Sequence, residues 1–159
     1  MRIGYGEDTH RLESNYALIL GGENIPFEKG LKGHSDADVL LHAITDALLG
    51  ALAMGDIGKW FPDTDPEYAG ISSLLLLEKV AEAVRKKGYR VVNLDSVIVA
   101  QRPKLAAYTD KMRENIAKAV FTNAENVSVK ATTTEGCGPE GRGECITARA
   151  VCLLEKDCD

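Results

Sequence analysis

One stretch of the sequence, residues 33–50, limits what this chain can fold into more than any other. Ser35 is a favourable N-cap residue, and Asp38 three residues later makes a weak capping box, so a helix is expected to begin here. Residues 39–53 are almost wholly apolar. The stretch therefore predicts a largely buried helix that the rest of the fold must cover.

Three polar side chains share one stripe of this expected helix. Asp38, His42 and Asp46 are spaced at i, i+4 and i+8, which places them on one face. A solvated face normally carries Lys, Glu and Arg, whereas this one carries short acids and a histidine. Taken alone, the stripe is equally consistent with a hydrogen-bonded core histidine flanked by two ordinary surface aspartates.

The N-terminal residues favour a metal site over that alternative. Residues 1–10 read as a short strand, in which alternation puts Asp8 and His10 on the same side. Together with His42 they form a candidate ligand set for zinc, and three protein ligands with an open fourth position are typical of catalytic zinc. Asp38 or Asp46 is then expected to orient an imidazole as a neighbouring carboxylate.

Composition limits the class of protein. The 159 residues are expected to form one domain, residues 1–159. The net charge of −5 argues against a general binder of nucleic acid or of anionic membranes. The sequence contains no apolar run of transmembrane length and no signal peptide, which predicts a cytoplasmic protein. The four cysteines, Cys137, Cys145, Cys152 and Cys158, contain no C-x-x-C pair and do not have the spacing of a zinc ribbon, so they are expected to be free thiols.

Apolar runs and turn residues predict the elements before residue 72. Residues 17–20 and 24–27 read as a hairpin around a Gly pair, and residues 28–33 as a mobile loop. Residues 55–66 are dense in turn residues and predict a loop or short 3₁₀ helix, in which Asp56, Asp63 and Asp65 have turn formation as their simplest role.

The remaining residues predict two helices and three strands. A helix capped by Ser72 or Ser73 is expected to end at Gly88, followed by a strand over residues 89–100. Pro103 is expected to open the next helix. That helix has the apolar stripe Leu105, Tyr108, Met112, Ile116 and Ala119. Strands over residues 126–132 and 145–155 flank a glycine-rich loop, so the order of elements predicts an α+β fold: a mixed sheet with helices on one face.

A second group of polar residues follows the strand at 126–132. Thr132, Thr133, Thr134 and Glu135 precede the glycine-rich loop that contains Arg142. Hydroxyls, loop N–H groups and Arg suit phosphate, and Glu suits Mg²⁺ or Mn²⁺. A threonine-rich strand beside a flexible loop explains the same pattern almost as well.

Four motifs in register give the sequence a specific resemblance. They are Gly4-x-Gly6-x-Asp8-x-His10, His34-Ser35-Asp36-x-Asp38-x-x-x-His42, residues 55–65 with Phe61-Pro62-Asp63-Thr64-Asp65, and residues 130–135 with Gly141-Arg142-Gly143-Glu144. Together they resemble the 2-C-methyl-D-erythritol 2,4-cyclodiphosphate synthase family, a phosphorus–oxygen lyase family of non-mevalonate isoprenoid biosynthesis, along essentially the whole chain.

The resemblance implies a reaction and a ligand set. It implies conversion of 4-diphosphocytidyl-2-C-methyl-D-erythritol 2-phosphate to the cyclic diphosphate and CMP, in a homotrimer with active sites between subunits. It also implies zinc on Asp8, His10 and His42, and a second cation, Mg²⁺ or Mn²⁺, on Glu135. The implied roles of the other positions are phosphate contact (His34, Ser35, Thr132, Thr133, Thr134), ribose contact (Asp56, Ile57, Gly58), the methylerythritol pocket (Phe61, Pro62, Asp63, Thr64, Asp65) and cytosine binding (Ala100, Gln101, Arg102, Pro103, Lys104, Leu105, Ala106).

Physical chemistry fits this reaction. The nucleophile would be the substrate's own 2-phosphate, already anionic at pH 7, so the site needs alignment and charge neutralisation rather than a general base. Cations would supply the neutralisation. We hypothesise that His34 and Thr133 stabilise the transition state by hydrogen bonds to its oxygens.

The sequence departs from the family pattern at two positions. Glu7 stands where an aromatic residue is common, and either alters metal affinity or points to solvent. Pro139 stands where a larger apolar residue near the substrate is common. Arg142 and Glu144 match positions near the trimer axis in relatives, where an isoprenoid diphosphate could bind.

Two rival functions remain open at this point. A zinc-dependent phosphohydrolase would activate water at the same Asp/His/His set and release inorganic phosphate. A non-catalytic nucleotide-binding or trimeric structural protein would keep residues 130–135 but would not need Asp8, His10 and His42 together.

Overall fold

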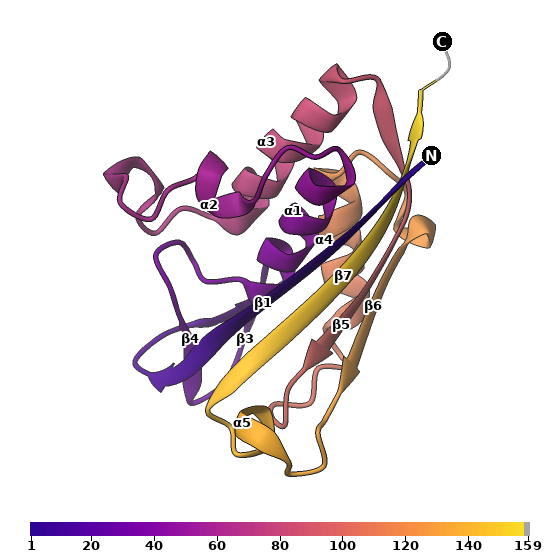
Figure 1. Cartoon of the computed structure of the whole chain (residues 1–159). Coiled ribbons are helices and arrows are strands. Elements are labelled where there is room, and N and C mark those ends of the chain that lie inside the picture. The colour runs from indigo at the N-terminus through magenta and orange to yellow at the C-terminus, as the bar shows by residue number, and fades with distance from the viewer. Residues whose placement is uncertain (158–159) are drawn as a thin grey trace.

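A five-stranded mixed sheet organises the molecule, of which the computed structural model describes residues 1–157 (Figure 1). The strand order is β4-β1-β7-β5-β6, and only the β5–β6 pair is parallel. A separate antiparallel hairpin joins β2 to β3. The strands are β1 (Arg2–Ser14), β2 (Leu18–Leu20), β3 (Glu23–Ile25), β4 (Lys29–Lys32), β5 (Tyr89–Val99), β6 (Val127–Thr132) and β7 (Cys145–Lys156).

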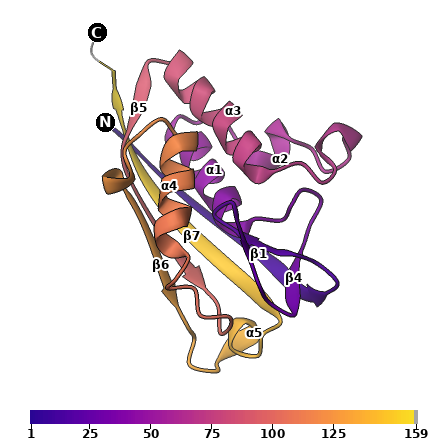
Figure 2. The same ribbon diagram turned by 180° about the vertical axis from the view of Figure 1, so that it is seen from behind.

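The long helices cover one face of this sheet. Figure 2, seen from behind, shows α1, α3 and α4 in front of the strands, whereas in Figure 1 the strands lie in front of the helices. The helices are α1 (Val39–Ala51), α2 (Ile57–Trp60), α3 (Ser73–Lys86), α4 (Thr109–Ala119) and α5 (Gly138–Gly141), with 3₁₀ turns η1 (Pro66–Tyr68) and η2 (Ala124–Asn126). The predicted mixed sheet with helices on one face is confirmed.

Helix α1 lies at the centre of the core. Ten of its residues are buried, including every leucine, because β1 and β7 cover one side and α3 covers another. It begins later than the sequence predicts: its N-cap is Asp38, whose side chain accepts a hydrogen bond from the Leu41 N–H. Ser35 does not cap the helix, because Ala37 adopts a left-handed φ of 59° and interrupts helical backbone between them. The helix ends before Ala53, which also has a positive φ.

Two other sequence predictions are wrong. The expected mobile loop at residues 28–33 contains strand β4, whose Lys29–Lys32 pair with residues 11–14 of β1. Such an edge strand is held by backbone hydrogen bonds, so its sequence needs no alternating pattern.

Pro103 does not open a helix. The chain after β5 turns through residues 101–108, with the Tyr108 N–H bonded to the Leu105 carbonyl, and α4 begins only at Thr109. Proline lacks an N–H and suits a turn as well as a first helical turn, so this signal cannot distinguish the two. Met112, Ile116 and Ala119 form the buried stripe, while Leu105 is buried from outside the helix.

The predicted hairpin, the helix that ends before Gly88, and the last two strands are confirmed with small shifts at their ends. Cys137, Cys145 and Cys152 are free, and Cys158 lies outside the described residues. Over residues 1–157, no helix has the length and apolar character needed to cross a membrane.

Candidate active site

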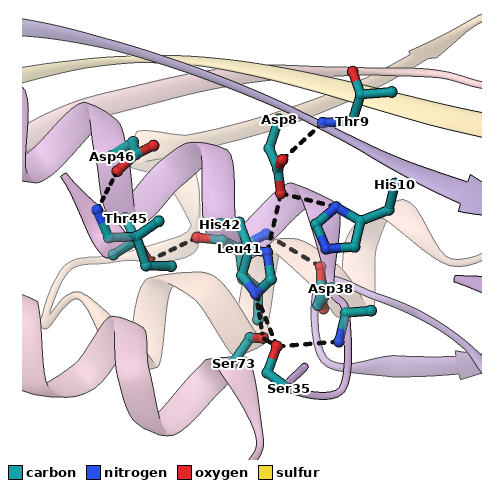
Figure 3. A network of polar contacts seen from close by, with 12 residues as sticks. Asp8, Thr9, His10, Ser35, Asp38, Leu41, His42, Thr45, Asp46 and Ser73 are labelled. Atoms are coloured by element: carbon teal, nitrogen blue, oxygen red, sulfur yellow. Dashed lines mark hydrogen bonds and ion pairs between the residues drawn. The ribbon is translucent and has the colours of Figure 1, made fainter. Parts of the chain in front are cut away.

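Asp8, His10 and His42 converge at the contact between β1 and α1. Their ligand atoms all lie within 4.8 Å of one another. The Asp8 Oδ2 atom is 3.0 Å from His42 Nδ1 and 3.1 Å from His10 Nδ1 (Figure 3). Strand alternation points Asp8 and His10 toward the helix, as the sequence predicts, and α1 supplies His42 from the other side.

Two glycines of β1 make this convergence possible. A Cβ atom added at Gly4 would lie 1.9 Å from the Ala47 carbonyl oxygen, and one added at Gly6 would lie 2.0 Å from that of Ala43. The backbone of α1 therefore rests directly on the backbone of β1, at a separation that no larger residue permits. His42 is consequently held within reach of Asp8.

The electrostatics of this cluster suit a cation. Burial alone would raise the pKa of Asp8, but the close polar contacts with the His10 and His42 imidazoles outweigh burial, and the pKa of Asp8 lies well below its usual range. The His10 Nδ1 atom is buried and lacks a hydrogen-bond partner among the described residues. One carboxylate and two imidazoles, with an unsatisfied nitrogen directed at the carboxylate, form a donor set that fits zinc.

The prediction that Asp38 or Asp46 orients a histidine ring is wrong. Asp38 is fully buried and accepts hydrogen bonds from the Gly22 and Leu41 N–H groups, while burial raises its pKa to about 6. Asp46 accepts from the Ile57 N–H at 2.7 Å. Both side chains are used to connect segments of backbone, a role that helical spacing alone cannot reveal.

Hydroxyl groups hold the far side of the His42 ring instead. His42 Nε2 lies 2.9 Å from Ser73 Oγ and 3.0 Å from Ser35 Oγ (Figure 3). Asp36 in turn lies 2.5 Å from the Ser73 hydroxyl. Sequence analysis missed the contribution of Ser73 and Asp36, because they lie 31 and 6 residues from His42 and no periodicity joins them.

Asp8, His10 and His42 line a pocket of about 430 Å³, which we call the first pocket. Its walls bring together many of the residues predicted to bind substrate: His34, Ser35, Ile57, Gly58, Phe61, Pro62 and Asp63. The His34 Nε2 atom lies 3.2 Å from the Asp65 carbonyl, which ties the His34 loop to the loop over residues 61–65.

The simple turn role holds for two of the aspartates near this pocket. Asp56 caps α2 by accepting from the Lys59 N–H, and Asp65 caps η1 by accepting from the Glu67 N–H. Asp63 instead lines the first pocket, whereas Thr64 does not.

Six of the seven residues predicted to bind cytosine, with two of the threonines predicted to contact phosphate, form a second pocket elsewhere on the chain. It has a volume of about 210 Å³ and shares no lining residue with the first pocket. Its predicted members are Ala100, Gln101, Pro103, Lys104, Leu105, Ala106, Thr132 and Thr133.

The loop that follows the second pocket is organised by its own polar groups. Thr133 Oγ1 donates to Glu135 at 2.7 Å, Thr134 bonds to the Cys137 carbonyl, and Gln101 accepts from the Gly136 N–H. The structure of one chain thus does not bring Thr133 or Glu135 to the Asp8 cluster.

A third pocket, of about 710 Å³, contains Pro139 and Arg142. Arg142 forms a two-point ion pair with Glu144, at 2.7 and 3.2 Å. Arg102 lies with Arg142 in a neighbouring cavity rather than in the second pocket.

Glu7 lies on the opposite face of β1 from Asp8. It is bonded to Tyr5 and to Arg149, the latter at 3.0 Å. The hydrogen bond from the Tyr5 hydroxyl, followed by the one from Arg149, lowers the pKa of Glu7. Of the two alternatives that the sequence leaves for Glu7, the structure supports the one in which the side chain points away from the metal cluster.

Comparisons with known proteins agree with this geometry. The sequence profile described as the YgbB family matches residues 1–155. The 2-C-methyl-D-erythritol 2,4-cyclodiphosphate synthase of Clostridium perfringens is 59% identical over 156 residues, which are 98% of this chain and all of that protein. The synthase of Syntrophotalea carbinolica is 62% identical, over 98% of this chain and 95% of its own length.

Solved structures give the same result. A 2C-methyl-D-erythritol-2,4-cyclodiphosphate synthase described as a CDP-bound form superposes with a TM-score of 0.89, at 38% identity, over 97% of this chain and all of that one. The chain therefore belongs to the YgbB family, the family of the 2-C-methyl-D-erythritol 2,4-cyclodiphosphate synthases.

Proposed function

We propose that this protein converts 4-diphosphocytidyl-2-C-methyl-D-erythritol 2-phosphate into 2-C-methyl-D-erythritol 2,4-cyclodiphosphate and CMP. The observation that carries the proposal is the convergence of Asp8, His10 and His42 at the floor of the first pocket, in a chain about 60% identical to such synthases over nearly its full length. A binding protein would have no use for this cluster beside the His34 loop.

The bonds made and broken explain why the site has no dedicated base. An oxygen of the substrate's 2-phosphate attacks the β-phosphorus, and the bond from that phosphorus to the bridging oxygen of CMP breaks. The attacking oxygen is already anionic, so no proton needs to be removed. Because a ring closes as the P–O bond breaks and no water is consumed, we class the reaction as that of a phosphorus–oxygen lyase.

Residues of this chain would hold two cations. Asp8, His10 and His42 are the proposed zinc ligands, and Glu135 is the proposed ligand of Mg²⁺ or Mn²⁺. When bound, such cations neutralise phosphate charge and act as Lewis acids. The donor types support this division, since imidazole suits zinc and an isolated carboxylate suits a hard cation.

The other pocket residues bind and align the substrate in this proposal. His34 and Thr133 donate hydrogen bonds to the oxygens that gain charge in the transition state. Asp56, Ile57 and Gly58 contact the ribose, and residues 61–65 enclose the methylerythritol carbons. Residues 100–106 bind the cytosine, and Ser35, Thr132 and Thr134 contact phosphate.

We propose further that the enzyme is a homotrimer whose active sites lie between subunits. Support comes from the separation of the first and second pockets in one chain, since a partner copy could bring the second pocket of one chain to the first pocket of another. The uncovered sheet face also exposes large apolar side chains, with Ile3 72% and Tyr5 57% accessible. Contiguous apolar groups of this kind are typical of interfaces.

An isoprenoid diphosphate near the trimer axis is part of the same proposal, with Arg142 as its cationic contact. The third pocket has Arg11, Lys29 and Arg142 against Glu13 and Glu144, and this excess of one positive charge favours a diphosphate. One domain over residues 1–159 and a cytoplasmic location complete the proposal.

Phosphorus NMR of the purified protein tests the reaction directly. With zinc, Mg²⁺ and the diphosphocytidyl substrate, we expect resonances of CMP and of a cyclic diphosphate, both abolished in His42→Ala. Release of orthophosphate would instead identify a zinc-dependent phosphohydrolase. Binding of the substrate without turnover would identify a non-catalytic nucleotide-binding protein.

A further inference from the structure

The His42 ring is held by polar groups at both of its nitrogens. Nδ1 faces Asp8 Oδ2 at 3.0 Å, and Nε2 faces Ser73 Oγ at 2.9 Å. The Ser73 residue is only 1% exposed, so its hydroxyl depends on protein partners rather than solvent. Its hydrogen bonds therefore constrain which nitrogen of His42 carries the proton.

The direction of these hydrogen bonds follows from Asp36. Its carboxylate accepts from both the backbone N–H of Ser73, at 3.0 Å, and the Ser73 hydroxyl, at 2.5 Å. An ionised carboxylate can only accept, so the Ser73 hydroxyl hydrogen is directed to Asp36. With its single hydrogen used, Ser73 Oγ can only accept from His42, and this hydrogen bond favours a proton on Nε2, which Ser35 Oγ at 3.0 Å can also accept.

A neutral imidazole with its proton on Nε2 has a lone pair on Nδ1. In the metal-free ring the Asp8 carboxylate, 3.0 Å from Nδ1, favours the opposite form with the proton on Nδ1, so the two nitrogens compete for one proton. A cation beside Asp8 would need the Nδ1 lone pair. The hydrogen bonds at Nε2 thus bias the ring toward the form that can bind a metal through Nδ1.

We infer that Ser73 and Asp36 are positioning residues that favour the Nε2–H form of His42 and so present Nδ1 as a metal ligand. The inference rests on the proposed role of His42 in the metal site. It assigns a task to two residues that contact neither the cation nor the substrate, and such outer groups typically change metal affinity by about tenfold to hundredfold.

The tautomer can be measured without metal. In metal-free protein, at a pH where the ring is neutral, long-range ¹H–¹⁵N spectra report the fraction of His42 with its proton on Nε2. We expect this fraction to fall in Ser73→Ala relative to wild type. Ser72→Ala is the matched control, because Ser72 is the adjacent N-cap residue of α3 and its side chain makes no capping hydrogen bond.

Zinc affinity, measured by competition with a chromophoric chelator, provides the second readout. We expect about tenfold to hundredfold weaker binding in Ser73→Ala and an unchanged affinity in Ser72→Ala. Asp36→Asn is an independent variant. The Ser73 N–H and hydroxyl bond to different oxygens of Asp36, and Asn replaces one of those oxygens with an NH₂ donor, so we expect weaker zinc binding there as well.

Two outcomes would overturn the inference. One is a Nε2–H fraction in Ser73→Ala equal to that of Ser72→Ala, and the other is an equal zinc affinity in the two folded variants. Failure of the proposed function gives different results: orthophosphate is released in place of a cyclic diphosphate, or wild-type protein binds no zinc, while the tautomer comparison in metal-free protein would still decide the role of Ser73.

Discussion

His34 shows how much can depend on one exposed side chain. It lines the first pocket beside the Asp8 cluster, and its Nε2 atom is held near the Asp65 carbonyl at 3.2 Å. A hydrogen-bond donor in this position can stabilise the negative charge that develops on phosphate oxygens during ring closure. Its proposed contribution is therefore to the transition state rather than to ground-state binding.

We expect His34→Ala to lower kcat by about 10²–10³-fold, the usual cost of removing one such donor. Steady-state kinetics with the diphosphocytidyl substrate measure the effect, and His34→Gln, which keeps an N–H donor, should recover part of the loss. A His34→Ala enzyme with a raised KM and an unchanged kcat would contradict the role assigned to His34.

Cys152 gives a residue-scale prediction about stability and pH. The residue is fully buried, its thiol donates to the Ala47 carbonyl at 3.3 Å, and burial raises its pKa to about 11. Because the folded state favours the neutral thiol, this stabilisation is complete below the pKa of an unfolded thiol, about 8.5, and is lost as the pH rises toward 11.

We expect the free energy of unfolding to fall between pH 8.5 and 11 more steeply in wild type than in Cys152→Ala, by at most about 3 kcal/mol in total. Urea unfolding at a series of pH values measures both slopes, and the difference cancels the titration of lysines and tyrosines. Equal slopes would mean that the buried thiol does not couple to folding.

At the scale of elements, the packing of α1 against β1 builds the metal cluster. Gly4 and Gly6 let the two backbones touch, with Ala43 and Ala47 opposite them. The metal cluster is thus set by a helix-to-strand distance, and anything that increases this distance separates His42 from Asp8.

Gly6→Ala should therefore destabilise the protein by about 1–3 kcal/mol or more and weaken zinc binding, since the new methyl group would overlap the Ala43 carbonyl. Gly50→Ala on the same helix is the control. Its added Cβ would approach no described atom more closely than 3.8 Å, and alanine favours helix, so we expect stability equal to or slightly above wild type. Urea midpoints and zinc affinities that did not separate the two variants would contradict this account.

The elements that could be predicted from sequence are those with a strong local pattern. The helix ending before Gly88 and the alternating β6 have such patterns and agree with the structure. The start of α1 differs because Ala37 has a left-handed φ next to Asp36, which is bonded to the distant residues Ile71 and Ser73. Strand β4 differs because only its partner β1 makes it a strand. Tertiary context decides both cases.

The residues of the candidate site also divide into those that the sequence could group and those that it could not. Strand alternation pairs Asp8 with His10 and helical spacing places His42 on a polar stripe, because each rule acts within one element. The chemistry of a three-ligand zinc site then joins the two elements. Ser73 comes from the start of α3 and Asp36 from the loop before α1, so their contact with one another and with His42 exists only after the helices have packed.

At the scale of the whole molecule, the first and second pockets raise the question of how one substrate could meet both. Thr9 in β1 pairs with Thr147 in β7, Thr147 pairs with Val99 in β5, and Val99 pairs with Thr132 in β6. Thr132 therefore lies three strand spacings from Thr9, or about 14 Å. Symmetric assembly offers a solution, because every copy can lend one pocket to a neighbour.

Mixed oligomers test this arrangement. Coexpression of His42→Ala with Thr133→Ala in equal amounts should restore about a quarter of wild-type activity, since a random mixture joins two intact halves in about one site in four. The two proteins expressed separately are the control, and light scattering should report three chains per particle. Activity no greater than the mean of the separate variants would mean that each site is built within one chain.

The pairing of β1 has a consequence for how the protein is made. The stretch of β1 that carries Asp8 and His10 pairs with residues 145–154 of β7, whereas β4 reaches only residues 11–14. During translation the first strand therefore leaves the ribosome more than a hundred residues before its partner. The metal cluster cannot be completed on a nascent chain until β7 has been synthesised, so an interrupted translation product would carry His42 but no ordered strand to meet it.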